Sequence, residues 1–145
     1  MLYSPDIKRA MLFAYNIHKK QFDLAGYPYI HHVLHIAEQM DTEKGVIVAL
    51  LHDVLEDSGD RETLRLFSQL GFDEEITSAV YAITRGKGEK YSDYITRVSQ
   101  NKLATSVKIK DLEHNMQADR LGNRINSFDL MKRYERAYDY LISLQ

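Results

Sequence analysis

Apolar residues recur every three or four positions along most of this chain, which is the spacing of helices that bury one face. Ser4-Pro5-Asp6 is a typical helix start, with a serine cap, a proline in the first turn and an acid near the positive end of the helix dipole. The chain has only two prolines and seven glycines, and strand-like alternation is rare. The pattern predicts an all-α protein, an irregular bundle of about seven or eight helices.

Caps, glycines and prolines set the expected bounds of these helices. The expected helices run from Pro5 to about Lys20, from Tyr29 or Ile30 to about Met40, from about Thr42 through Asp57, from Arg61 to Leu70, from about Asp73 to Ile83, from Tyr91 to about Ser99, from Leu103 to about Ala118, and from Ser127 to Leu144. The polar stretch Asp119 to Asn126 is expected to be a connection, and Gly71 is expected to end the fourth helix.

The third expected helix organises the rest of the chain. Its residues from Val46 to Leu51 are apolar on every side, which places it at the centre of the bundle. It then continues into four polar residues, His52, Asp53, Glu56 and Asp57. Residues three and four apart share a helix face, so these side chains converge within two turns. One imidazole beside three carboxylates predicts a divalent metal with acid/base carboxylates next to it.

Composition narrows the class of protein. The 145 residues fit one domain, expected to span residues 1–145. A net charge of −2 argues against nucleic acid and anionic membranes as partners. The chain has no cysteine, so disulfides and thiolate sites are excluded. It shows no signal peptide and no long apolar run, and we therefore expect a cytoplasmic location. The sequence does not indicate an oligomeric state.

A metal at this point needs ligands from other helices. His32 in the second helix and Asp111 in the seventh are the candidates, because each is a polar residue in a largely apolar segment. Two imidazoles and two carboxylates suit Mn²⁺, Fe²⁺, Zn²⁺ or Co²⁺ better than Ca²⁺. A single histidine is more often an ordinary core or surface residue, so the prediction depends on all four appearing together in order.

Four stretches carry a resemblance to a known family. They are residues 18–21 with 26–32 (HKKQ and GYPYIHH), 49–57 (ALLHDVLED), 83–85 with Tyr91 and Tyr94, and 107–116 (VKIKDLEHNM). Together they resemble the HD-domain metal-dependent phosphohydrolases, in particular the RelA/SpoT-type branch, the guanosine 3′,5′-bispyrophosphate pyrophosphohydrolases and their small single-domain relatives. The resemblance implies an HD-domain fold for the whole chain.

The resemblance also implies roles for individual residues. His32, His52, Asp53 and Asp111 match the metal ligands, and the expected ion is Mn²⁺, with Fe²⁺, Zn²⁺ or Co²⁺ as alternatives. His31 does not match a ligand, and a solvent-facing or supporting position is expected for it. Glu56 and Asp57 match the pair that orients or deprotonates the attacking water, in keeping with a carboxylate acting as a base beside a metal. Solvated acids at a helix end are the bland alternative.

Several further residues are candidates for substrate binding. They are Asn115, Arg85, Lys87, Tyr91, Tyr134 and His18. Asn115 matches a substrate-contacting asparagine of the family, whereas the basic loop residues also fit an ordinary solvated loop and the tyrosines also fit a core. His114 is expected to point elsewhere and to be structural, and His35 is expected to play an ordinary packing role.

The function expected from the resemblance is metal-dependent hydrolysis of a small nucleotide-like substrate, with guanosine 3′,5′-bis(diphosphate) losing its 3′-pyrophosphate as the first choice. One departure favours an alternative. Asp23-Leu24 stand where the alarmone hydrolases typically carry an Arg-Lys pair that packs on the guanine and meets the phosphates. The alternatives are an HD phosphohydrolase for another small nucleotide phosphate and a non-catalytic nucleotide-binding helical protein.

Overall fold

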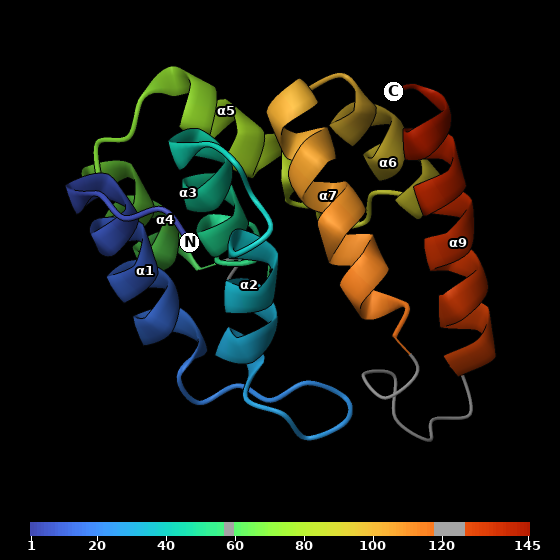
Figure 1. The fold of residues 1–145 in the computed structure, drawn as a ribbon, viewed down its shortest axis with the longest axis horizontal. Helices are drawn as coiled ribbons and strands as arrows, with labels where there is room; N and C mark the ends of the chain where they lie inside the picture. The colour runs from blue at the N-terminus through green and yellow to red at the C-terminus, as the bar shows by residue number, and fades with distance from the viewer. Residues whose placement is uncertain (57–59, 118–126) are drawn as a thin grey trace.

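The computed structural model describes residues 1–56, 60–117 and 127–145, and the regular elements of this part of the chain are helices joined by loops (Figure 1). Its eight helices are α1 (Pro5–His18), α2 (Tyr29–Ala37), α3 (Glu43–Leu51), α4 (Arg61–Gln69), α5 (Glu74–Ile83), α6 (Tyr91–Ser99), α7 (Lys102–Asn115) and α9 (Ser127–Ser143). Among the described residues the only extended pairing is a single bridge between Phe22 and Pro28. The prediction of an all-α bundle is confirmed.

Local sequence explains most helix ends. The Ser4 hydroxyl accepts a hydrogen bond from the backbone N–H of Ile7, and Thr42 and Asp73 cap α3 and α5 in the same way. Gly71 follows α4 with a φ of 70°, a left-handed conformation that glycine adopts without steric cost. The predicted connection at Asp119 to Asn126 lies outside the described residues.

Helix α3 lies at the centre, as its apolar pattern predicted. Every side chain from Val46 to Leu51 is fully buried, and the helix packs against α1, α2, α5 and α7. Helix α7 in turn contacts α6 and α9, which lie beside it in Figure 1. The apolar centre of the bundle therefore brings α2, the end of α3 and α7 together.

The prediction that α3 continues through His52, Asp53 and Glu56 is wrong, because the helix ends at Leu51. The His52 Nδ1 atom lies 2.6 Å from the Ala49 carbonyl, which a continuing helix would use for its own ladder. The backbone N–H of Glu56 then bonds the Asp53 carbonyl three residues back, which is a tighter turn than an α-helix makes. The polar residues therefore lie on a turn after the helix.

No helix within residues 1–56, 60–117 and 127–145 combines the length and the apolar character that crossing a membrane requires.

Candidate metal centre

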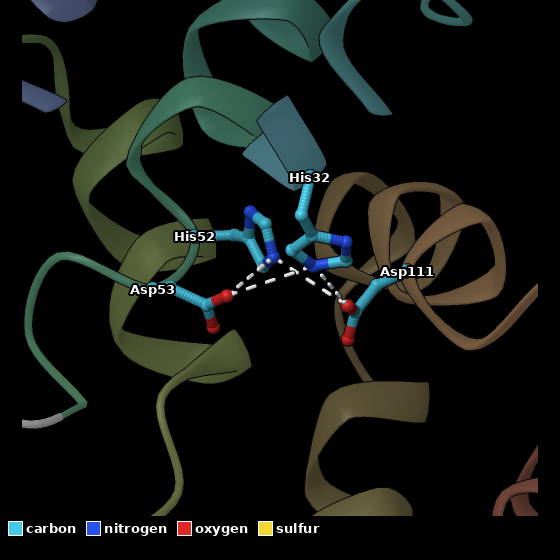
Figure 2. A group of neighbouring side chains, drawn as sticks. All are labelled: His32, His52, Asp53 and Asp111. Atoms are coloured by element: carbon cyan, nitrogen blue, oxygen red, sulfur yellow. Dashed lines mark ion pairs between the residues drawn. The ribbon is translucent and has the colours of Figure 1, made fainter. Parts of the chain in front are cut away.

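Four side chains from three parts of the fold meet at one point (Figure 2). His32 lies in the first turns of α2, His52 and Asp53 lie on the turn after α3, and Asp111 lies in α7. Each offers one ligand atom, and these atoms all lie within 4.8 Å of one another. His32, His52 and Asp111 are almost fully buried, while Asp53 is partly open to solvent.

The four ligand atoms form two close pairs. His32 Nε2 lies 3.0 Å from Asp111 Oδ1, and His52 Nε2 lies 2.9 Å from Asp53 Oδ2. The crossed distances are 3.8 Å from His32 Nε2 to Asp53 Oδ2 and 3.6 Å from His52 Nε2 to Asp111 Oδ1. Two imidazole nitrogens and two carboxylate oxygens therefore face a common centre, and this donor set suits a divalent transition metal.

The hydrogen bonding of the imidazoles supports this interpretation. A carbonyl oxygen can only accept, so the 2.6 Å contact to Ala49 places a proton on His52 Nδ1, and Nε2 is the nitrogen that faces the carboxylates. The Nε2 atoms of both His32 and His52 are buried and make no hydrogen bond among the described residues. A cation between these buried nitrogens and the carboxylate oxygens would satisfy both, so these residues fit a bound metal.

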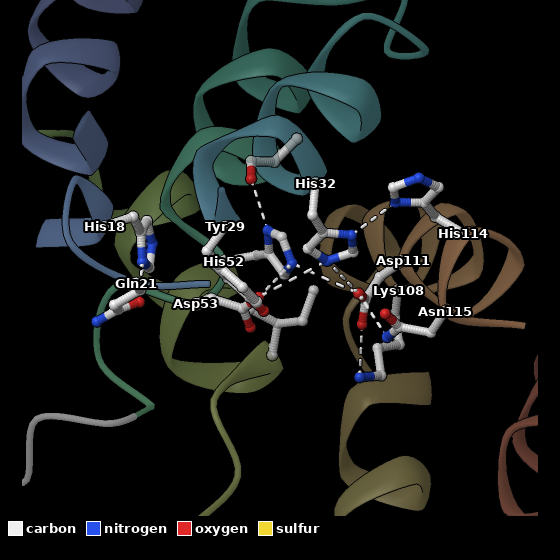
Figure 3. Close-up of polar contacts among 12 residues, drawn as sticks. His18, Gln21, Tyr29, His32, His52, Asp53, Lys108, Asp111, His114 and Asn115 are labelled. Atoms are coloured by element: carbon white, nitrogen blue, oxygen red, sulfur yellow. Dashed lines mark hydrogen bonds and ion pairs between the residues drawn. The ribbon is translucent and has the colours of Figure 1, made fainter. Parts of the chain in front are cut away.

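A second layer of side chains holds the four residues in place (Figure 3). The Tyr29 hydroxyl donates a hydrogen bond to Asp53 Oδ2. Asn115 Nδ2 lies 3.0 Å from Asp111 Oδ1, and Lys108 Nζ lies 2.8 Å from Asp111 Oδ2. Such contacts orient ligands and tune their basicity, so the carboxylates are positioned before any ion binds.

His114 also belongs to this second layer, which corrects the prediction that it points elsewhere. Its Nδ1 atom lies 2.7 Å from His32 Nδ1, and the two rings stack with their centroids 5.0 Å apart. His35 stacks on His114 in turn at 4.0 Å, in keeping with the packing role expected for it. His31 is exposed, as the resemblance implied. Because residues 111 and 114 share one side of α7, this contact follows from helix geometry.

Charges in the centre shift the pKa values of its members. Burial opposes ionisation of Asp111, but Lys108 and the two imidazoles outweigh it and hold the Asp111 pKa well below its usual value. Burial likewise opposes ionisation of Asp53, and His52 beside it reverses that effect and lowers the pKa. Burial works against the Lys108 ammonium, yet Asp111 raises its pKa well above the usual value. Both carboxylates and Lys108 are therefore charged at neutral pH.

Glu56 stands apart from these groups in its ionisation. Part of the residue is exposed, but the surrounding protein and the Asp53 carboxylate together raise the pKa of its carboxyl to about 7. A carboxyl with a pKa near neutrality can both accept and release a proton at physiological pH. Asp57, the other predicted catalytic residue, lies outside the described residues.

A cavity of about 260 Å³ opens beside the centre. Its walls are Tyr29, Asp53, Glu56, Arg85, Tyr91, Tyr94, Lys108, Asp111, Asn115, Arg133 and Tyr134. Three of these residues are cationic and three are acidic, and the acids are Glu56 and the two carboxylates of the candidate metal centre. A divalent cation held by those carboxylates would leave Arg85, Lys108 and Arg133 to bind an anion next to it.

The structure brings together most of the predicted substrate-binding residues. Arg85, Tyr91, Asn115 and Tyr134 line the cavity. Lys87 is exposed and does not line it. His18 is buried behind the cavity wall, where its ring packs against Tyr29 at 5.1 Å and its Nδ1 lies 2.7 Å from Gln21 Oε1. His18 therefore reaches the site through Tyr29.

Sequence reasoning missed Lys108, Arg133 and the role of Tyr29. Lys108 had a readable signal, because it precedes Asp111 by three residues and so shares its helix face. Arg133 had none, because its position depends on how α9 packs against α6 and α7.

Comparisons with known proteins give a consistent picture, although no protein-family model matches the chain. The chain is 30% identical over 128 residues to a probable GTP pyrophosphokinase of Mycobacterium leprae, and 26% identical over 140 residues to the GTP pyrophosphokinase of Myxococcus xanthus. It is 29% identical over 135 residues to a GTP pyrophosphokinase rsh of Brucella melitensis. Each match covers 79% of this chain but only 16 to 18% of the relative, so the chain spans less than a fifth of those proteins.

A solved structure matches nearly the whole chain. It is described as a metazoan ortholog of SpoT that hydrolyzes ppGpp, with a TM-score of 0.73, 20% identity, and coverage of 97% of this chain and 88% of that one. This likeness establishes the fold. The chain therefore has the HD-domain fold and resembles the RelA/SpoT-type enzymes over most of its length, as its motifs predicted.

Proposed function

We propose that this protein is a metal-dependent phosphohydrolase that acts on a nucleotide, with guanosine 3′,5′-bis(diphosphate) as the first candidate substrate and its 3′-pyrophosphate as the group released. The observation that carries the proposal is the convergence of His32, His52, Asp53 and Asp111 beside a cavity whose lining also includes two arginines and a lysine. The solved structure of the same fold is described as that of a ppGpp-hydrolysing protein, which supports the choice of substrate.

In this proposal the four converging residues hold one divalent cation, expected to be Mn²⁺. Such an ion supplies Lewis-acid stabilisation of phosphoryl charge and makes water more acidic. Tyr29, His114, Asn115 and Lys108 keep the four side chains in position through the contacts described above.

Glu56 is the residue best suited to take the proton from the attacking water. Its pKa of about 7 leaves a large fraction ionised at neutral pH, while the carboxyl remains basic enough to accept a proton. Asp57 is proposed to assist it, as the motif implies. Arg85, Lys108 and Arg133 line the cavity and are proposed to bind the phosphate oxygens of the substrate.

A second candidate function rests on the loop before α2. Asp23 Oδ1 accepts hydrogen bonds from the backbone N–H groups of Ala25 and Tyr27, at 3.0 and 2.9 Å, so this carboxylate stabilises the turn. Asp23 does not line the cavity, and it therefore does not place a repelling charge there. The exposed Leu24 still cannot replace the basic residue that the alarmone hydrolases carry. This keeps hydrolysis of another small nucleotide phosphate as the second candidate.

The test is release of phosphate or pyrophosphate from a nucleotide panel that includes guanosine tetraphosphate, with Mn²⁺ present. Asp53→Ala is compared with the wild type, and Asp93→Ala, an exposed acid on α6, is the matched control. Pyrophosphate release from guanosine tetraphosphate that is lost in Asp53→Ala and kept in Asp93→Ala supports the first candidate. Release from other nucleotides only supports the second. No release from any nucleotide contradicts both and favours a binding protein.

A further inference from the structure

A second cavity, of about 360 Å³, lies between α6 and α9, which run side by side (Figure 1). Its lining residues are Tyr91, Ser92, Ile95, Thr96, Arg133, Arg136, Ala137 and Tyr140. Most of this surface is apolar or aromatic, and two guanidinium groups are its charged members. Of these residues, only Arg133 was given a role in the proposed function, and that role was on the metal side.

The second cavity adjoins the metal-side cavity. Tyr91 and Arg133 line both of them. The Arg133 guanidinium carbon lies 4.6 Å from the centroid of the Tyr91 ring, and that of Arg85 lies 5.5 Å from the same ring. One tyrosine with stacked arginines thus forms the boundary between the two spaces, so a ligand passing this ring would occupy both.

The two arginines of the second cavity differ from other arginines of the chain in their ion pairing. Arg9, Arg65 and Arg97 each form an ion pair with a carboxylate. In the part of the chain that the structure describes, Arg133 and Arg136 form neither an ion pair nor a hydrogen bond, and the cavity lining contains no Asp or Glu. Two guanidinium groups at an apolar wall favour a phosphate attached to an apolar or aromatic body.

Cavity size points in the same direction. The metal-side cavity, of about 260 Å³, is below the range of roughly 300 to 1,000 Å³ that whole small-molecule ligands occupy. It can take the reacting phosphates, but a complete nucleotide needs more space. The neighbouring cavity, of about 360 Å³, supplies that space on the α9 side.

We infer that the cavity between α6 and α9 binds the part of the nucleotide that is not hydrolysed, with a second phosphate group on Arg133 and Arg136 and the apolar remainder against Ile95 and Tyr140. The inference rests on the proposed function and assigns a binding place to the phosphate group that is not released. The reacting group lies at the metal centre, and the second phosphate lies beyond the Tyr91 ring.

The test uses Arg136→Gln, because Arg136 is exposed and lines the second cavity but not the metal-side cavity. Lys132→Gln is the matched control, since it removes one positive charge from an exposed position on the same helix that lines neither cavity. Thr96→Trp, at an exposed lining position, fills the cavity by a different route. For guanosine tetraphosphate with Mn²⁺ we expect Arg136→Gln and Thr96→Trp to raise KM about tenfold and to change kcat less than twofold.

Product inhibition shows which part of the nucleotide loses affinity in Arg136→Gln. The inhibition constant of guanosine 5′-diphosphate should rise about tenfold in Arg136→Gln, whereas that of inorganic pyrophosphate, which needs only the metal side, should stay within twofold. Equal constants in Arg136→Gln and the wild type would overturn the inference, and so would equal losses in Arg136→Gln and Lys132→Gln, which would indicate a general field effect.

Failure of the proposed function gives a different result. If the wild type hydrolyses no nucleotide, the same three variants are compared by calorimetric binding of guanosine tetraphosphate. A dissociation constant that is tenfold larger in Arg136→Gln than in Lys132→Gln then supports nucleotide binding in this cavity, although no reaction takes place. Equal constants reject it.

Discussion

The Asp53 carboxylate makes three contacts at once. It faces the Nε2 atoms of both histidines and accepts a hydrogen bond from the Tyr29 hydroxyl. The sequence identified Asp53 as a ligand candidate from its neighbours in the motif, but Tyr29 lies 24 residues earlier and only the fold brings it to this carboxylate. Residue types that do the chemistry are readable from sequence, whereas the contacts that orient them depend on packing.

Tyr29→Phe should weaken binding of Mn²⁺ about tenfold, because it removes the donor that orients Asp53 while leaving all four ligands in place. Competition with a chelating dye at pH 7 measures the change. Tyr27→Phe is the matched control, since Tyr27 is exposed in the preceding loop and does not line the cavity. Equal affinity in the wild type and Tyr29→Phe would show that the hydroxyl has no such role.

Glu56→Gln should stabilise chelator-treated protein at high pH. The folded-state pKa of Glu56, about 7, lies above its ordinary 4.5, so the protonated form is favoured on folding. That stability is present below pH 4.5 and is lost as the pH rises to about 7. Glutamine cannot ionise and therefore avoids the loss.

The shift alone would correspond to about 3 kcal/mol, but Glu56 is partly exposed, and we expect a gain of about 1 kcal/mol at pH 8. At pH 5 the gain should be close to zero. Urea unfolding at the two pH values measures it, with Glu135→Gln on the exposed side of α9 as control. A gain of the same size at both pH values would rule out ionisation of Glu56 as its cause.

Helix starts follow closely from local sequence, because caps such as Ser4 and Thr42 act on backbone groups three residues away. The end of α3 did not follow, because it depends on the His52 ring reaching the Ala49 carbonyl. The loop between α5 and α6 is another such case. The conformation of this loop depends on Arg97, a residue of α6 that lies eight positions after the loop residue Glu89.

Several hydrogen bonds and an ion pair from Arg97 stabilise this loop. Its guanidinium donates to the carbonyls of Tyr81, Ala82 and Thr84 at 2.8 to 3.2 Å and pairs with Glu89 at 3.0 Å. Arg85 Nε in turn donates to the Glu89 carbonyl at 2.9 Å, so the loop positions a residue of the metal-side cavity.

Arg97→Gln should lower the free energy of unfolding by about 1 to 2 kcal/mol, because the loop carbonyls lose their donors. It should also raise KM for the nucleotide through Arg85. Arg65→Gln, which breaks one exposed pair on α4, should leave the free energy of unfolding nearly unchanged. Urea unfolding compares the two, and equal effects would contradict the loop's dependence on Arg97.

The whole molecule shows what the sequence could and could not predict. The apolar pattern of Val46 to Leu51 was enough to place α3 at the centre, and the ordered motifs were enough to bring His32 and Asp111 to it. The second cavity, between α6 and α9, was not predictable in this way. Its residues have no motif, and they meet only because α9 packs on α6 and α7.

The central claim is that one divalent ion binds where α2, the end of α3 and α7 converge. The most direct measurement is a calorimetric titration of chelator-treated protein with Mn²⁺, comparing the wild type with Asp53→Asn and with the exposed control Asp93→Asn. We predict one ion per chain, binding at least about 100-fold weaker in Asp53→Asn and unchanged binding in Asp93→Asn. Absence of binding in the wild type, or equal affinity in Asp53→Asn, would contradict the claim.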